Sequence, residues 1–324
     1  MKKILKIILN LVIFLVVTGF IWYIVRSLGN GERLFAERNQ KTSFTGPYRK
    51  DISFKLPYEI NRFELHDGQL FISAGNEVFI YDTAGKRLAS FPVKEEVRDI
   101  TVEKGQIYVL YPTFIEVYNT VGQLQLEWEA CSPLSDYCSF ALAGDYVFVT
   151  DAVNKNICKY TKDGDFVTFI QSPKGFIIPS YSFDIESRND TLYCINSGRH
   201  LIETYTLDGQ FITAFGHSGS EDGYFAGCCN PSYLSFTPDG YLLTSEKGNP
   251  RISSFEHNGL FREILLNSRL MGGGSNAYKV RADENRLFIA GKNAMTIFNY
   301  DSNRQVINCQ STCADCANCP LRTL

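Results

Sequence analysis

Short hydrophobic segments alternate with turn residues along most of the chain. Hydrophobic and polar residues alternate with a period of two, which predicts half-buried antiparallel strands. Glycine-containing pairs divide these segments, and glycine readily adopts the positive φ that tight turns require. The clearest copy predicts four strands, at Phe63–His66, Gln69–Ser73, Glu77–Tyr81 and Arg87–Phe91.

This pattern recurs six times, and each copy contains an aromatic residue followed by turn residues. The six aromatic-to-turn segments are Tyr81–Gly85, Tyr118–Gly122, Tyr160–Gly164, Tyr205–Gly209, Phe255–Gly259 and Phe298–Ser302. Successive aromatic residues lie 37 to 50 residues apart, which is the period of a four-stranded propeller blade. We therefore predict an all-β fold, a six-bladed β-propeller of four-stranded antiparallel blades. The later blades are expected to begin near Asp99, Ser139, Ser182, Tyr233 and Lys279.

A closed propeller needs an outer strand for its sixth blade. Ile52–Pro57 precedes the first inner strand at the spacing by which Arg87–Pro92 precedes the second. We therefore expect the N-terminal segment to complete the last blade, which leaves few open sheet edges. Arg304–Cys309 is the competing candidate for this place.

An uncharged apolar run, Ile7–Val25, lies near the N-terminus. At about 1.5 Å per residue its helical length nearly matches a hydrocarbon core of about 30 Å. A cleaved signal peptide is the alternative, but no convincing small-residue cleavage site follows the run. We predict a single-pass anchor in the cytoplasmic membrane, with the propeller outside the cytoplasm. The predicted parts are an anchor at 1–26, a linker at 27–50, the propeller at 51–308 and a cysteine-rich tail at 309–324.

Two stretches resemble NHL repeats. Phe215–Phe225, followed by Pro231 and Pro238, is similar to the junction between such repeats. The remainder of the repeat is matched in blades three and five, at Asp151, Asn156, Ile157 and Tyr160, and at Asn249, Arg251, Ile252 and Phe255. The resemblance implies a six-bladed propeller of the NHL type. That family includes scaffolds and a few lyases, so the fold alone assigns no activity.

The chain has ten cysteines, and four of them are close together in the tail. These candidate metal or cluster ligands are Cys309, Cys313, Cys316 and Cys319. The spacing of the last three is that of bacterial iron-sulfur cluster loops, whereas structural zinc sites more often use two separated pairs. An iron-sulfur cluster is therefore the first candidate cofactor and zinc the second. Disulfides are the alternative, because cysteines of exported proteins usually pair.

We expect the other six cysteines to share one face of the propeller with the tail. Cys131 and Cys138 flank one loop and are candidates for a disulfide, while Cys158 and Cys194 also suit ordinary buried positions. The adjacent pair Cys228 and Cys229 departs from the ordinary NHL junction, which has no cysteine there. We therefore add this pair to the candidate cofactor-binding residues. The residues expected to line the same face are His200, His217, Glu246, Lys247 and Arg251.

Composition narrows the possible functions. The net charge of −3 and the absence of a basic run in the body argue against nucleic-acid binding. No two of the four histidines have metal-ligand spacing, so we expect a binding or scaffold module with a protein partner rather than an enzyme. The module would belong to a redox assembly of the cell envelope. The alternatives are a metal-dependent lyase or hydrolase, and a disulfide-stabilised structural domain without a cofactor.

Overall fold

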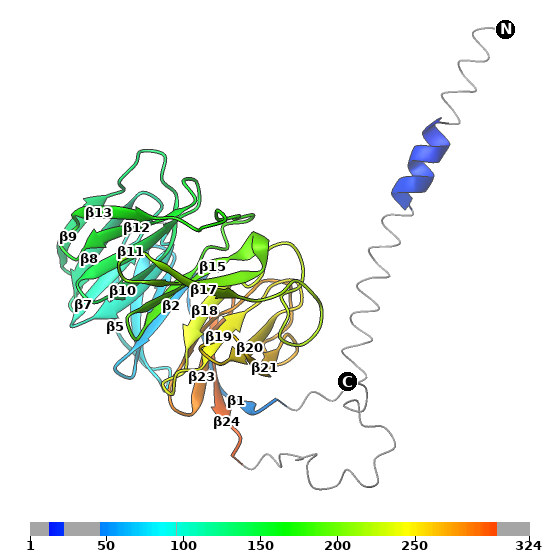
Figure 1. Ribbon diagram of the computed structural model, residues 1–324. Helices are drawn as coiled ribbons and strands as arrows, with labels where there is room; N and C mark the ends of the chain where they lie inside the picture. Colours follow the sequence, from blue (N-terminus) through cyan, green and yellow to red (C-terminus); the bar gives the residue numbers. More distant parts are fainter. Residues whose placement is uncertain (1–12, 23–45, 95, 303–324) are drawn as a thin grey trace, which may run out of the picture. The chain divides into compact units, whose positions relative to one another are not determined.

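The structure is a computed structural model that describes residues 13–22, 46–94 and 96–302. The chain divides into two compact units, Met1–Thr45 and Gly46–Leu324, and all the described strands lie in the second. These 24 strands form six four-stranded antiparallel sheets, which are the blades of a propeller (Figure 1). The predicted all-β, six-bladed fold is confirmed.

The first five blades each consist of four consecutive strands. Blade one contains β2 (Ile60–His66), β3 (Gln69–Ala74), β4 (Glu77–Asp82) and β5 (Arg87–Pro92). Blade two contains β6 (Asp99–Glu103), β7 (Gln106–Leu110), β8 (Phe114–Asn119) and β9 (Leu124–Glu129). Blade three contains β10 (Tyr137–Ala143), β11 (Tyr146–Asp151), β12 (Asn156–Thr161) and β13 (Phe166–Ile170). Blade four contains β14 (Ile185–Arg188), β15 (Thr191–Asn196), β16 (Leu201–Thr206) and β17 (Phe211–Phe215), with a short 3-10 helix η1 (Ser197–Arg199) between β15 and β16. Blade five contains β18 (Tyr233–Phe236), β19 (Leu242–Ser245), β20 (Arg251–Phe255) and β21 (Phe261–Asn267).

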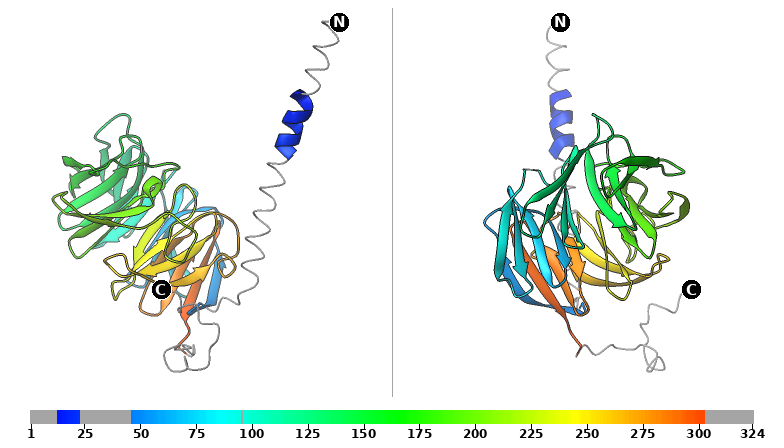
Figure 2. Two further views of the ribbon diagram at one scale, coloured as in Figure 1. Left: turned by 45° about the vertical axis from the view of Figure 1, so that its right-hand side comes forward. Right: turned by 90° about the vertical axis from the view of Figure 1, so that its left-hand side faces the viewer.

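The sixth blade joins the two ends of the propeller. It contains β22 (Lys279–Ala282), β23 (Arg286–Ala290), β24 (Ala294–Tyr300) and, as its outer strand, β1 (Tyr48–Lys55). β1 runs antiparallel to β24, with Ile52 opposite Ile297 and Lys55 opposite Ala294. Figures 1 and 2 show the blue β1 beside the orange β24. The prediction that the N-terminal segment closes the ring is confirmed, although the strand begins at Tyr48, inside the segment predicted as linker.

The first strand of each blade lies next to the propeller axis. These inner strands are β2, β6, β10, β14, β18 and β22, and each contacts the next around the ring. β22 also contacts β2, so the ring is closed at its centre. Side chains on alternate positions of the inner strands therefore face a common axis.

The repeated glycine lies in close contact with the preceding blade. In five blades a β-carbon on this glycine would lie 2.2 to 2.9 Å from a side chain of the preceding blade's outer strand. The pairs are Gly85 with Phe54, Gly122 with Phe91, Gly164 with Trp128, Gly209 with Ile170, and Gly259 with Phe215. The repeated glycine therefore serves two purposes. It allows a tight turn within its own blade, and it allows close packing against the preceding blade.

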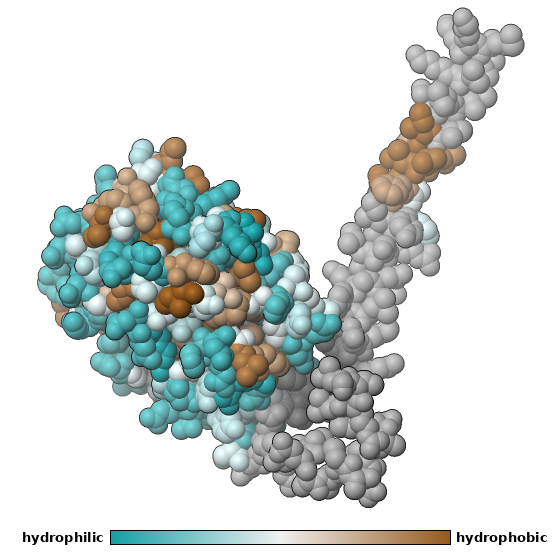
Figure 3. Space-filling view, in the orientation of Figure 1, coloured by the Kyte–Doolittle hydropathy of each residue, from teal (hydrophilic) through white to brown (hydrophobic). Residues whose placement is uncertain are grey.

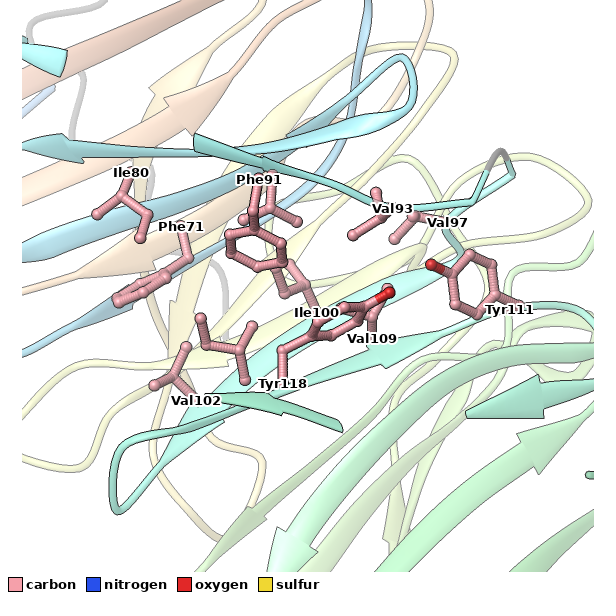
Figure 4. Close-up of a cluster of buried hydrophobic side chains, with 12 residues drawn as sticks. Phe71, Ile80, Phe91, Val93, Val97, Ile100, Val102, Val109, Tyr111 and Tyr118 are labelled. Carbon is pink, nitrogen blue, oxygen red and sulfur yellow. The ribbon is translucent and has the colours of Figure 1, made fainter. Parts of the chain in front are cut away.

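The same outer-strand aromatic residue also packs on the aromatic residue of the repeat. The ring of Phe91, in blade one, lies 5.1 Å from the ring of Tyr118, in blade two. Figure 4 shows this pair within a buried cluster that includes Ile80, Ile100 and Val109. Burial of such rings supplies much of the hydrophobic stabilisation between blades.

The first unit is described at residues 13–22, which are helical. Its apolar side chains are exposed, including Phe14 and Trp22 at 65% and 60%, and they form the brown segment in Figure 3. Among the described residues, no helix combines the length and the apolar character needed to cross a membrane. The other residues of the predicted anchor lie outside the described ranges.

Candidate functional site

A polar cavity of about 630 Å³ opens at one end of the propeller axis. Its walls include Arg62 from β2, Tyr233 from β18 and Lys279 from β22. Loop residues, among them Ser180 and Lys247, complete its rim. The volume is in the range of cavities that hold small molecules or single side chains of a partner.

The floor of this axial pocket is a buried network of opposite charges. Lys279 Nζ lies 3.4 Å from Asp184 Oδ1 and 3.8 Å from Asp99 Oδ1, and the three side chains are at most 3% exposed. Arg62 Nε approaches the same Asp99 oxygen at 3.9 Å. Burial by itself would raise the pKa of Asp99, but Lys279 and Arg62 outweigh it and hold that pKa below its usual value.

A second tier of charges lies two residues further along the same strands. Arg281 contacts Glu64 and Glu186, each at 2.8 Å. Burial raises the pKa of Glu186 to about 7, against the opposing effect of Arg281. Glu186 and Arg281 also line a smaller cavity of about 150 Å³. Because strand side chains alternate with a period of two, Arg62 and Glu64 of β2 lie in successive tiers, as do Lys279 and Arg281 of β22. Asp184 and Glu186 have the same spacing at the start of β14, whereas β6 contributes Asp99 to the first tier alone.

Several residues around the axial pocket have a polar group with few internal partners or an unusual backbone conformation. Arg62 Nε is buried and makes no hydrogen bond within the described part of the chain. Lys247 Nζ donates to Ser182 Oγ at 3.5 Å, and in the same part of the chain no ion pair joins it to a carboxylate. Ser180 and Tyr181 both have positive φ, at 83° and 56°, which non-glycine residues rarely adopt. Such strained backbone is concentrated at functional sites.

The adjacent pair Cys228 and Cys229 lies next to two lining residues of this pocket, Ser180 and Lys247. The two sulfur atoms are 3.1 Å apart, and Cys229 Sγ is 3.6 Å from the Oγ of the pocket residue Ser180. Burial would raise the pKa of Cys229, but Lys247, Cys228 and Ser180 lower it below its usual value. Lys247, which was predicted to line the same face as this pair, therefore lies close enough to Cys229 to stabilise its thiolate.

Asn230 holds the cysteine pair and Lys247 together. Its amide nitrogen donates to the carbonyl oxygens of Ala226, at 2.7 Å, and Lys247, at 2.9 Å. Its amide oxygen accepts from the Lys247 backbone nitrogen at 2.9 Å. Asn230 is buried, so these bonds fix one loop against the other.

The remaining described cysteines lie in two other places, and all six described cysteines are free thiols. Cys138 and Cys194 are buried in one hydrophobic cluster of blades three and four. Cys131 Sγ lies 3.4 Å from Cys158 Sγ. The predicted bond between Cys131 and Cys138 is not formed, because Cys138 follows the start of β10 and packs in the core while Cys131 faces β12. In the described part of the chain the six cysteines therefore lie in three places: the pair Cys228 and Cys229, the pair Cys131 and Cys158, and the core cluster that contains Cys138 and Cys194.

On mild oxidation we expect a disulfide between Cys131 and Cys158. Their sulfur atoms need to move together by little more than 1 Å to reach bonding distance. Trypsin would then leave peptides 105–155 and 156–159 crosslinked, with Cys138 still available for alkylation. Cys131→Ser should abolish the crosslink. A bond within peptide 105–155 would instead support the pairing of Cys131 with Cys138.

The other residues predicted to line this face have mainly structural contacts. Glu246 and Arg251 form a buried ion pair at 2.6 Å, and Arg251 also donates to the carbonyl oxygen of Tyr224. His217 packs against Tyr224 in a tilted arrangement, with ring centroids 5.4 Å apart. His200 follows η1 with a positive φ of 58°. Of the five predicted residues, Lys247 lines the axial pocket and the other four do not.

The tail cysteines Cys309, Cys313, Cys316 and Cys319 lie outside the described residues, so their role as cluster or metal ligands stays a prediction. Within residues 13–22, 46–94 and 96–302, no three or more histidine, cysteine or acidic side chains are grouped closely enough to hold a metal ion.

The charged residues that meet near the propeller axis were not predicted, although the sequence contains a pattern that indicates them. In three predicted blades two charged residues stand two positions apart at the inner strand, where hydrophobic residues would otherwise be expected. They are Arg62 with Glu64, Asp184 with Glu186, and Lys279 with Arg281. Because opposite charges recur at matching positions of different blades, their meeting on the axis could have been inferred.

Comparison with known proteins identifies the fold and no family. No protein-family model matches the chain, and no curated protein matches it. Among solved structures, a catalytically inactive virginiamycin B lyase from Staphylococcus aureus with quinupristin has a TM-score of 0.55 at 15% identity, over 78% of this chain and 99% of that one. A streptogramin B lyase has a TM-score of 0.55 at 14% identity, over 78% and 98%. The WD40 domain of Neurospora crassa Pan2 has a TM-score of 0.54 at 7% identity, over 82% and 98%. At these identities the likeness concerns architecture alone, and the chain is a six-bladed β-propeller whose structural neighbours include lyases of the virginiamycin B type.

Proposed function

We propose that this chain is a membrane-anchored, NHL-type binding propeller whose axial pocket receives an anionic group of its ligand or protein partner. The observation that carries the proposal is the set of cationic groups on the pocket wall. Arg62, Lys247 and Lys279 line one cavity. A carboxylate or phosphate there would accept charge-assisted hydrogen bonds, which are stronger than those between neutral groups.

The charge balance of the pocket supports an anionic ligand. The two cations of the floor, Arg62 and Lys279, are matched by Asp99 and Asp184. At the rim, Lys292 pairs with Glu59 at 3.7 Å. Lys247 adds a positive charge that no described carboxylate neutralises. A ligand carboxylate or phosphate beside Lys247 would compensate it.

The anchor is the second part of the proposal. The apolar run Ile7–Val25 is followed by a polar segment with several glycines, as expected of a linker that separates a domain from a bilayer. The described portion of this run is helical. An orientation with the propeller outside the cytoplasm would present the axial pocket to ligands or proteins of the cell envelope.

Binding of simple anions to the full-length protein in detergent tests the pocket. The probes are inorganic phosphate, N-acetylglutamate and its neutral analogue N-acetylglutamine, titrated by calorimetry. We expect at least one of the anions to bind and the neutral analogue to bind more weakly. Lys247→Met should weaken the binding about tenfold or more, because a hydrogen bond to a charged group contributes about 1.5–3 kcal/mol.

Lys55→Met is the matched control, because it removes an exposed lysine from the outer strand β1. It should leave binding unchanged. If neither anion binds, or if Lys247→Met and Lys55→Met have equal effects, the axial pocket is not an anion site. The preference between phosphate and N-acetylglutamate would indicate the class of the natural ligand.

A further inference from the structure

We infer that Cys228 and Cys229 form a thiol–disulfide exchange site, in which the oxidised pair accepts two electrons from a thiol donor. This redox activity goes beyond ligand binding in the axial pocket, although both involve Lys247. It follows from the different surroundings of two adjacent sulfur atoms.

The two thiols differ in accessibility. Cys228 is exposed, whereas Cys229 is 4% exposed and faces Ser180 and Lys247. Their sulfur atoms are 3.1 Å apart, so a bond between them requires a displacement of about 1 Å. An external thiol can therefore reach the Cys228 sulfur and not its neighbour.

The surroundings of Cys229 suit the sulfur atom that leaves during reduction. Lys247 and Ser180 stabilise its thiolate, and the pKa of Cys229 lies below its usual value although burial opposes this. A thiol with a lower pKa is the faster leaving group in thiol–disulfide exchange. Asn230 fixes the Lys247 backbone beside the cysteine loop, and the Lys247 ammonium group donates to Ser182 Oγ at 3.5 Å.

The exchange balances with a low-molecular-weight thiol as the reductant. Its thiolate attacks Cys228 Sγ, the bond between the two cysteines breaks, and the electron pair passes to Cys229 Sγ as a thiolate. A second thiolate then attacks the donor sulfur of the mixed disulfide, which releases the donor disulfide and the Cys228 thiolate. A proton from solvent converts Cys228 to its thiol. One protein disulfide is reduced and two donor thiols are oxidised to one disulfide.

The disulfide form and the reduced form of the pair each have a property that favours reduction of the disulfide. A disulfide between adjacent residues is strained, and strain makes the bond more reducible. Stabilisation of the Cys229 thiolate lowers the free energy of the reduced form. Strained and exposed disulfides are the labile or catalytic ones, whereas structural disulfides resist the glutathione pool.

Peptide mapping of the full-length protein tests the exchange. The tryptic peptide 200–247 contains these two cysteines and no others. After incubation with excess glutathione disulfide we expect it to be lighter by two hydrogens, without a lasting glutathione adduct. Cys229→Ser should instead retain glutathione on Cys228, because the resolving thiolate is missing. Cys228→Ser should react little, because Cys229 is buried.

Lys247 is a positioning residue, and its variants separate a redox role from a structural one. Lys247→Met should slow the reduction of the pair by glutathione about tenfold, through the raised pKa of the leaving thiol. Lys247→Arg should restore most of the rate. The proposal is overturned if both cysteines of the parent remain alkylatable after oxidation, if the parent keeps a glutathione adduct, or if Lys247→Met reduces as fast as the parent.

Discussion

Gly259→Ala is expected to destabilise the propeller by about 2–5 kcal/mol. Gly259 has φ +89°, and the left-handed conformation costs a non-glycine residue about 1–2 kcal/mol. An added β-carbon would also lie 2.2 Å from the Phe215 ring, in the outer strand of the preceding blade. Such overpacking typically costs about 1–3 kcal/mol more. Chemical denaturation of the full-length protein, followed by tryptophan fluorescence, measures the change.

Gly105→Ala separates backbone strain from the clash between blades. Gly105 has a similar φ of +75°, but nothing lies within 4 Å of the position that its β-carbon would take. We expect this variant to lose about 1–2 kcal/mol through backbone strain alone. Equal losses for Gly259→Ala and Gly105→Ala would show that the contact with Phe215 does not hold the two blades together.

The repeated glycine at position 259 shows why the sequence predicts the propeller fold correctly. A repeat of fixed length specifies a local unit of four strands, and each unit must bury its faces against similar neighbours. The turn and the contact between blades are encoded by the same glycine, so the pattern at Gly259 carries both pieces of information. Closure of the propeller by β1 was also predictable. Ile52–Pro57 precedes the first inner strand at the spacing of an outer strand, and no inner strands of the same blade precede it.

The candidate site was less predictable because it depends on side-chain direction. Cys131 and Cys138 are close in sequence, and their loop suggested a pair. In the structure Cys138, on β10, faces the core while Cys131 faces Cys158 on β12. A shift of one residue at the start of a strand reverses the face of a side chain. Strand boundaries predicted from sequence are not accurate to one residue, so they do not determine which face of the sheet a side chain points to.

Lys279→Met is expected to cost about 3–5 kcal/mol at neutral pH, because removal of one partner leaves buried charges without compensation. Lys279 lies within ion-pair distance of both Asp99 and Asp184, and all three side chains are nearly inaccessible. Methionine fills a similar volume, so the loss comes from electrostatics rather than from a cavity. The free energy of unfolding of the full-length protein measures the effect. Adding Asp184→Asn should recover part of the loss, since the amide oxygen of the new side chain could still accept from the Leu234 backbone nitrogen, which lies 2.7 Å from Asp184 Oδ2.

The loss should also depend on pH. In the parent the lowered pKa of Asp99 contributes stability that is present above the unfolded pKa of about 4 and is lost as the pH falls through the folded pKa. Lys279 makes the largest contribution to lowering this pKa, so its removal reduces the stabilisation. The difference between variant and parent should therefore be largest at pH 7 and shrink below about pH 4. Lys292→Met is the control, because its ion pair with Glu59 is 80% and 66% exposed and should contribute at most about 1 kcal/mol. A pH-independent loss, or equal losses in both variants, would mean that the floor charges do not support one another. If the expected difference is found, the pocket floor is electrostatically satisfied without a ligand, and the anion affinity of the site then depends on Lys247 at its rim.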